Sequence, residues 1–82
     1  MEKRLGVVGI VVENREIAPQ VNSILSEYAD IIIGRIGLPH QMEDISVISL
    51  ITSGASDEVR ELTGKLGKLK AVQVTCAEAE SM

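Results

Sequence analysis

Few side chains in this sequence could carry out chemistry, and they stand apart from one another. His40 is the only histidine and Cys76 is the only cysteine. A cysteine nucleophile needs a neighbouring base, and a closed metal site needs more ligands than one histidine and one cysteine. No sequence feature brings the two together, so we expect a solvated histidine and a cysteine that packs at a strand end. The sequence predicts no catalytic residue, no metal site and no cofactor.

The acidic residues and the glycines also lack the spacing of a catalytic site. The carboxylates are spread singly over predicted turns and helix faces, and no pair lies in apolar surroundings that would separate two pKa values. Gly6 with Gly9 and Gly34 with Gly37 are the closest approach to a phosphate clamp, but neither pair completes a dinucleotide fingerprint or a phosphate loop. We therefore expect a protein that is not an enzyme.

Arg35 is the exception among the polar residues, because it interrupts the aliphatic stretch from Ile31 to Ile36. A guanidinium beside aliphatic side chains needs a bound anion, a carboxylate partner or a position at the edge of a sheet. A carboxylate from a neighbouring chain and a small ligand both stay open at this point. Arg35 is thus the first candidate for a binding residue.

Hydrophobic spacing divides the chain into the strands and helices that must position these residues. Short β-branched stretches predict strands, and apolar residues at helical spacing predict helices. The segment 37–39 predicts the end of the second strand before a polar loop, His40 to Asp44, and Ser56 is the expected N-cap of the second helix. In order, the predicted elements are a strand at 5–12, a helix from Ile17 or Ala18 to Tyr28, strands at 31–36 and 45–52, a helix at 56–66, a strand at 71–76 and a frayed tail at 77–82.

This βαββαβ order predicts a single α+β domain over residues 1–82. Two β-α-β halves joined without crossing connections form a ferredoxin-like sandwich. Both helices then lie on one face of an antiparallel sheet with the strand order 4-1-3-2. The first and third predicted strands occupy the centre of that sheet.

The central strands present aliphatic residues on both of their faces. Alternation places Leu5 and Val7 on one face of the first strand and Val8 and Ile10 on the other. Two helices can cover one face only, and a bare aliphatic face exceeds the apolar patch that monomers normally tolerate. We therefore expect the chain to pair with itself, as a homodimer or a homotetramer.

The overall composition excludes several classes of partner. The formal net charge is −4 and aromatic residues make up 1% of the chain. This charge has the wrong sign for neutralising phosphates, and a single aromatic ring cannot stack on bases, so we expect no nucleic acid partner. No apolar stretch approaches the roughly 18 residues that cross a bilayer, so we expect no membrane association. The lone cysteine fits a reducing compartment, which predicts a cytoplasmic protein.

Three segments resemble one small bacterial family. Residues 33–39 (IGRIGLP), 45–50 (ISVISL) and 62–67 (LTGKLG) are similar to the iron-only hydrogenase system regulators, and the resemblance covers essentially the whole chain. It implies an ACT-type ferredoxin-like domain, akin to the C-terminal ligand-sensing and tetramer-forming domain of the nickel-responsive repressor. The histidine ligands and the DNA-reading arm of that repressor have no counterpart here. Regulation would therefore act through a protein partner or a sensed metabolite.

The resemblance also implies a ligand site. In ACT-type assemblies, small ligands bind where the first strand-to-helix turn faces a neighbouring subunit, and Glu13, Asn14 and Arg15 occupy that turn. Backbone N–H groups at the start of a helix suit carboxylates and other anions. We expect these three residues and Arg35 to bind a small anionic metabolite in a homo-oligomeric ACT-like regulatory module tied to iron-only hydrogenase regulation or assembly. A purely structural oligomerisation protein without a ligand is the alternative.

Overall fold

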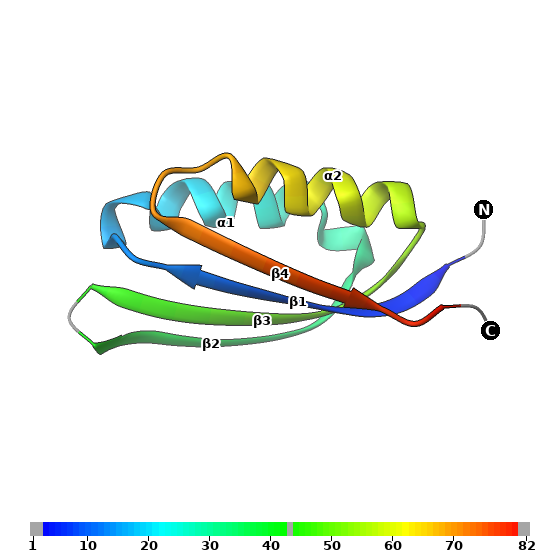
Figure 1. The fold of residues 1–82 in the computed structure, drawn as a ribbon, viewed down its shortest axis with the longest axis horizontal. Helices are drawn as coiled ribbons and strands as arrows, with labels where there is room; N and C mark the ends of the chain where they lie inside the picture. Colours follow the sequence, from blue (N-terminus) through cyan, green and yellow to red (C-terminus); the bar gives the residue numbers. More distant parts are fainter. Residues whose placement is uncertain (1–2, 43, 81–82) are drawn as a thin grey trace.

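The computed structural model describes residues 3–42 and 44–80, with the backbone alone for residues 39–42. Both helices pack on the same face of one antiparallel sheet with the strand order β2-β3-β1-β4 (Figure 1). This arrangement confirms the predicted ferredoxin-like sandwich. The elements are β1 (Arg4–Val12), the 3-10 helix η1 (Arg15–Ile17), α1 (Ala18–Glu27), the 3-10 helix η2 (Ala29–Ile31), β2 (Ile32–Met42), β3 (Ile45–Gly54), α2 (Ser56–Gly67) and β4 (Val72–Glu78).

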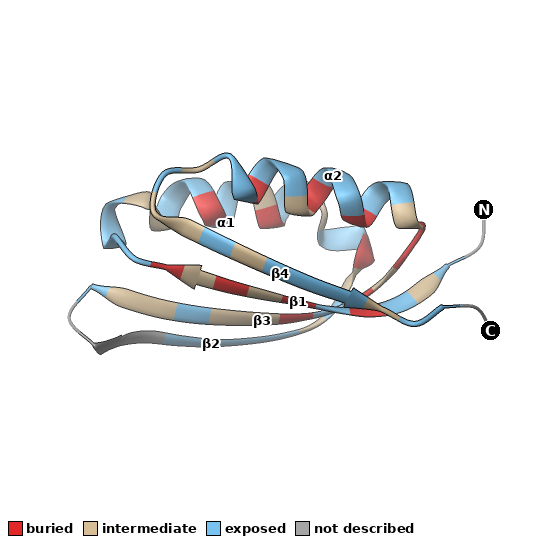
Figure 2. Cartoon of the chain, in the orientation of Figure 1, coloured by how far each residue is buried: buried red, intermediate tan, exposed pale blue. Residues whose placement is uncertain are grey.

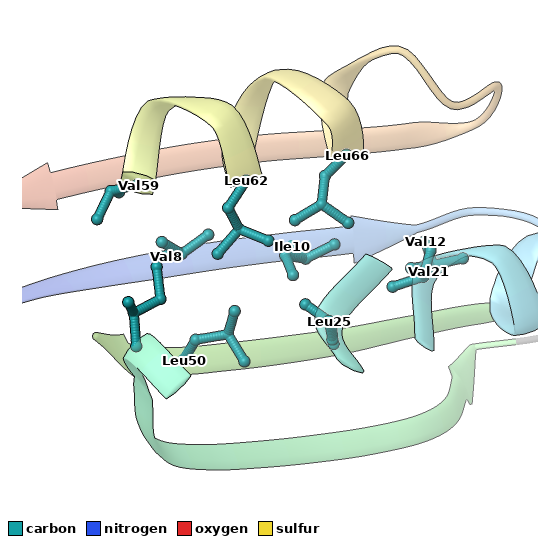
Figure 3. Packing of buried hydrophobic residues seen from close by; sticks show 10 residues of the cluster. Val8, Ile10, Val12, Val21, Leu25, Leu50, Val59, Leu62 and Leu66 are labelled. Atoms are coloured by element: carbon teal, nitrogen blue, oxygen red, sulfur yellow. The ribbon is translucent and has the colours of Figure 1, made fainter. Parts of the chain in front are cut away.

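The hydrophobic core lies between the sheet and the helices (Figure 3). Because side chains alternate along a strand, every second residue of β1 faces the helices, and from Gly6 onward these residues are buried (Figure 2). Burying one such side chain is worth about 1.5–3 kcal/mol. The core cluster consists of Val8, Ile10, Val12, Val21, Leu25, Ile31, Leu50, Val59, Leu62 and Leu66.

The register around the central strand β1 fixes which residues share a face. Val8 lies opposite Leu50 of β3 on one side and Cys76 of β4 on the other. This set faces the helices. The next residue, Val7, lies opposite Ile51 and therefore faces away from them. The two-sided pattern predicted for the central strands is confirmed.

The first helix begins as predicted, at Ala18, after a capped 3-10 turn. Asn14 is extended, and its Oδ1 accepts a hydrogen bond from the Glu16 N–H at 2.9 Å, so it caps η1. Pro19 lies in the first turn of α1, where its missing N–H leaves no helical hydrogen bond unmade. Asn14 thus caps the short helix η1, which leads directly into α1.

The N-cap of the second helix was predicted wrongly. Ala55, not Ser56, holds the N-cap position, and the Glu58 carboxylate accepts a hydrogen bond from the Ala55 N–H at 3.0 Å. This contact secures the helix start without a cap hydroxyl. Ser56 is the first helical residue, and its hydroxyl donates instead to Glu78 of β4 at 3.4 Å. Within the described part of the chain, neither helix is long and apolar enough to cross a membrane.

The second strand is longer than predicted. We expected it to end before Gly37 and a polar loop to run from His40 to Asp44, but β2 continues through Pro39 to Met42. The pairing with β3 shifts register between Leu38 and Met42. β2 is an edge strand, and a proline is tolerated there because one side of the strand makes no sheet hydrogen bonds. Most of the segment that we expected to be a loop therefore belongs to the end of β2, next to the turn into β3.

The last strand also extends further than predicted. It ends at Glu78 rather than Cys76, and Ala79 N–H donates to the carbonyl of Leu5 at 2.8 Å. Pairing with the start of β1 therefore orders the backbone at residues 77–79, where we expected a frayed tail. Residues 81–82 lie outside the described part of the chain.

Candidate anion-binding cleft

A cleft of about 500 Å³ lies where the start of α1 approaches the edge of the sheet formed by β2 and β3. Two of its described lining residues are arginines, and none is acidic. The lining residues are Arg15, Ala18, Pro19, Asn22, Arg35, Gly37, Leu38, Ser46, Val47 and Ile48.

Arg35 projects from β2 on the helix side of the sheet. It lies opposite Leu50, a core residue, so its side chain shares the helix-facing side of the sheet. Because β2 is an edge strand, the charge stays exposed while the backbone pairs, which is one of the three solutions that the sequence left open. Arg35 Nη2 donates a hydrogen bond to Asn22 Oδ1 of α1 at 2.8 Å. This contact fixes the guanidinium at the cleft.

Arg15 reaches the same cleft from η1. Its Nε lies 3.1 Å from Asp44 Oδ1, and both side chains are more than half exposed. An exposed ion pair of this kind is worth about 0–1 kcal/mol, so an incoming anion can compete for the guanidinium. The two arginines, far apart in the sequence, thus line one opening.

The space in the cleft depends on small residues. Gly37 lies opposite Ile48 on β3, and a Cβ added at Gly37 would meet nothing within 4 Å. Ala18 contributes only a methyl group from the first turn of α1. A Cβ at Gly37 would therefore meet open space, and a longer side chain there would extend into the cleft.

Of the four ligand-binding residues predicted from the sequence, the structure brings Arg15 and Arg35 together. Glu13 and Asn14 do not line the cleft. The Glu13 N–H donates to the carbonyl of Ala71 at 2.8 Å, and the Asn14 side chain caps η1. The ligand role assigned to these two residues stays a prediction.

Asn22 is the cleft residue that sequence reasoning missed. It lies on the exposed side of α1, where the hydrophobic pattern assigns a polar residue no function. Its contact with Arg35 joins a helix to an edge strand, and no local motif encodes such a pairing. The one available signal was that Arg35, predicted in a strand, needed an acceptor from another element.

Other reactive groups lie away from the cleft. Partial desolvation, assisted by the carboxylate of Glu78, raises the pKa of the Cys76 thiol, which keeps it protonated near neutral pH. Lys65 contacts Tyr28 and lies 3.2 Å from Glu27 Oε1, and these contacts raise the pKa of Lys65. Among the described residues, no three His, Cys, Asp or Glu side chains are grouped as metal ligands would be.

Solved structures that share this architecture include three of differing identity. The uncharacterized protein TM1266 from Thermotoga maritima is 35% identical with a TM-score of 0.91, covering 96% of this chain and 100% of that one. The ACT domain of GTP pyrophosphokinase from Chlorobium tepidum has 21% identity and a TM-score of 0.70, covering 100% and 92%. CPII, a nitrogen regulatory PII-like protein from Thiomonas intermedia K12, has 13% identity and a TM-score of 0.54, covering 94% and 91%. At their low identities, the last two show the fold alone.

These likenesses show that the molecule has an ACT-like fold of the ferredoxin-like class. A family model described as "TM1266-like: Iron-only hydrogenase system regulator, putative" matches residues 4–76, and the chain belongs to this family. The resemblance noted in the sequence is thereby confirmed. Among curated proteins, none matches the sequence.

Proposed function

We propose that this chain is a non-enzymatic regulatory module that binds a small anionic ligand in the cleft between α1 and β2. The observation that carries the proposal is the pair of arginines, Arg15 and Arg35, lining one cleft whose described residues include no carboxylate. The chain as a whole has a net charge of −4, so a cationic cleft departs from its general surface. The site therefore favours an anion that can compete with Asp44 for Arg15.

The geometry at Arg35 supports binding rather than a merely solvated charge. The hydrogen bond to Asn22 holds the guanidinium in one orientation before any ligand arrives. A planar guanidinium presents paired N–H donors that match the oxygens of carboxylate or phosphate. Preorganisation of this kind lowers the entropic cost of binding, so a small carboxylate or phosphate compound is the favoured ligand class.

Relatives of the fold support the same ligand class. The PII-like protein CPII was solved with ADP, AMP and bicarbonate, all of which are anions. The family description connects this chain to control of iron-only hydrogenase. In our proposal, ligand occupancy of the cleft alters contact with a protein partner of that system.

A thermal-shift screen followed by calorimetry tests the proposal. The probes are inorganic phosphate, bicarbonate, AMP, ADP, succinate and free amino acids. A ligand that binds only the folded chain adds about 2.7 kcal/mol of stability at a hundred times its Kd, so Tm rises with its concentration. At least one probe is expected to raise the Tm of the wild-type chain.

Matched variants tie that shift to the cleft. Arg35→Gln removes a guanidinium, and Gly37→Leu fills the space, so each should abolish the ligand-induced rise in Tm. Arg60→Gln removes a similar exposed charge from α2, outside the cleft, and should leave the rise intact. If no probe raises Tm, or if the cleft variants respond as the wild type does, the proposal is wrong.

A structural oligomerisation protein without a ligand is the second candidate. It is favoured by the aliphatic residues that the sheet exposes on the side away from the helices. Such a protein assembles but shows no rise in Tm with any probe. The same screen therefore separates the two candidates.

A further inference from the structure

The face of the sheet that the helices do not cover is aliphatic and exposed. Seven large apolar side chains are between 39% and 68% exposed, and all of them lie on strands β1, β2 and β3. The strand register turns six of them, all but Ile33, away from the helices, and the other face of the sheet is filled by the core (Figure 3). The seven residues are Leu5, Val7, Ile33, Ile36, Leu38, Val47 and Ile51. We refer to the sheet surface opposite the helices as the outer face.

The outer face carries no charge along its paired, described positions. Residues directly opposite one another in neighbouring strands share a face of the sheet. The partners of Val7 and of every second residue along β1 from it therefore also point away from the helices. Charged residues make up 24% of the whole chain, so their absence from the described outward positions of the sheet sets this face apart from the rest of the surface. The outward positions are Leu5, Val7, Gly9 and Val11 of β1, Ile45, Val47, Ser49, Ile51 and Ser53 of β3, Gln73, Thr75 and Ala77 of β4, and Gly34, Ile36 and Leu38 of β2.

The size of this face matches a small stable interface. Four strands spaced about 4.8 Å apart, each about nine residues long, give a flat footprint of about 600 Å² before side-chain relief is added. Standard interfaces bury about 800 Å² per partner. The flat footprint alone is about three quarters of that value, so one partner of similar width can cover the outer face.

The outer face has shallow hollows between its projecting side chains. A hollow of about 200 Å³ is lined in part by Gly9, Val47 and Thr75. Another of about 360 Å³ is lined in part by Val7, Ile51 and Ala77, and Glu78, which the register turns toward the helix side, also lines it. The larger aliphatic side chains project beside these hollows. A face that combines hollows and projections of similar size can interlock with an identical face.

We propose that the outer face is a two-fold interface with a second copy of this chain. The absence of charge identifies the occupant, because a charged partner would find no complementary group here, whereas an identical face brings no like charges together. In a two-fold contact, aliphatic residues of one copy cover those of the other. This inference does not rest on the proposed ligand: apart from Leu38 and Val47, which line both surfaces, the outer-face residues lie outside the cleft.

Molecular mass in solution tests the interface. Light scattering at micromolar concentration is expected to give a dimer or a larger even assembly for the wild-type chain. The double variant Val7→Lys/Val47→Lys, with two charges on the outer face, should weaken self-association about 100-fold or more. Because both positions are exposed in the single chain, circular dichroism should show the variant folded. Ser23→Lys, on the exposed side of α1, is the matched control and should assemble normally.

A mixing experiment separates an interface from a folding defect. The oppositely charged variant Val7→Glu/Val47→Glu should also be folded and monomeric alone. Mixed with the lysine variant, it should form a heterodimer, because each positive face then meets a negative one. A wild-type chain that is monomeric at tens of micromolar, a folded lysine variant that still assembles, or a mixture that stays monomeric would each overturn the proposal. None of these outcomes depends on a ligand in the cleft.

Discussion

Thr52 is a single residue whose environment conflicts with its chemistry. It lies on β3 with no exposed surface, and its Oγ1 has no hydrogen-bond partner in the described part of the chain. A buried hydroxyl without a partner costs about 1–3 kcal/mol. Thr52→Val keeps the shape and removes the hydroxyl, so we expect the free energy of unfolding to rise by about 1 kcal/mol or more, measured by urea titration.

A second threonine supplies the control for that measurement. Thr63 Oγ1 donates to the carbonyl of Arg60 at 3.2 Å, so its hydroxyl is already satisfied. Thr63→Val should leave the stability unchanged or lower it slightly. A Thr52→Val chain no more stable than the wild type would mean that the hydroxyl has a partner in solution.

Cys76 allows a pH-dependent prediction at the same scale. Its thiol pKa is raised, first by partial desolvation and then by the carboxylate of Glu78, so the folded chain disfavours the thiolate. At about pH 8, iodoacetamide should alkylate the folded chain more slowly than the chain unfolded in urea, because less thiolate is present. The folded chain therefore keeps its full stability, as far as this thiol is concerned, below the ordinary thiol pKa. That contribution to stability is lost as the pH rises through the higher pKa of the thiol in the folded chain. Glu78→Gln should narrow the difference in alkylation rate; equal rates would contradict the raised pKa.

Two glycines in different elements should respond to alanine in opposite ways. A Cβ at Gly54, at the end of β3, would approach the buried Ile31 Cγ2 to 2.8 Å, whereas a Cβ at Gly64 of α2 would meet nothing within 4 Å. Gly54→Ala should therefore lower the free energy of unfolding by about 1–3 kcal/mol, while Gly64→Ala should raise it by about 1 kcal/mol through helix propensity. Paired denaturation curves measure both. Equal responses would mean that the close packing of η2 on β3 is not maintained.

The sequence was most informative about elements with a regular pattern. Short β-branched apolar runs, such as residues 5–12, and helical spacing from Ile17 onward predicted the element order. The rule that connections do not cross then left only the observed sheet. The end of β2 could not be predicted, because Pro39 reads as a break unless its strand is known to lie at an edge. The Arg35–Asn22 contact was equally hidden, since it depends on how α1 lies against the sheet.

At the scale of the whole molecule, the cleft and the outer face should differ in their response to salt. Arg15 and Arg35 attract anions by exposed charge, which salt screens. The outer face has no charge along its described strand positions, and its burial is driven by the hydrophobic effect. Raising NaCl from about 0.05 M to about 0.5 M should weaken ligand binding in calorimetry and leave self-association in light scattering unchanged. Dissociation of the assembly by salt would point to an interface elsewhere on the molecule.

Leu38 and Val47 belong to both surfaces, because they line the cleft and are also exposed on the outer face. A ligand on one side and a second copy on the other would therefore contact the same two residues of one hairpin. Thermodynamic reciprocity requires that any change which ligand binding makes in dimer affinity equals the change which dimer formation makes in ligand affinity. Ligand affinity would then depend on the concentration of the chain itself. The abundance of the protein would become an input to its regulation, alongside the abundance of the metabolite.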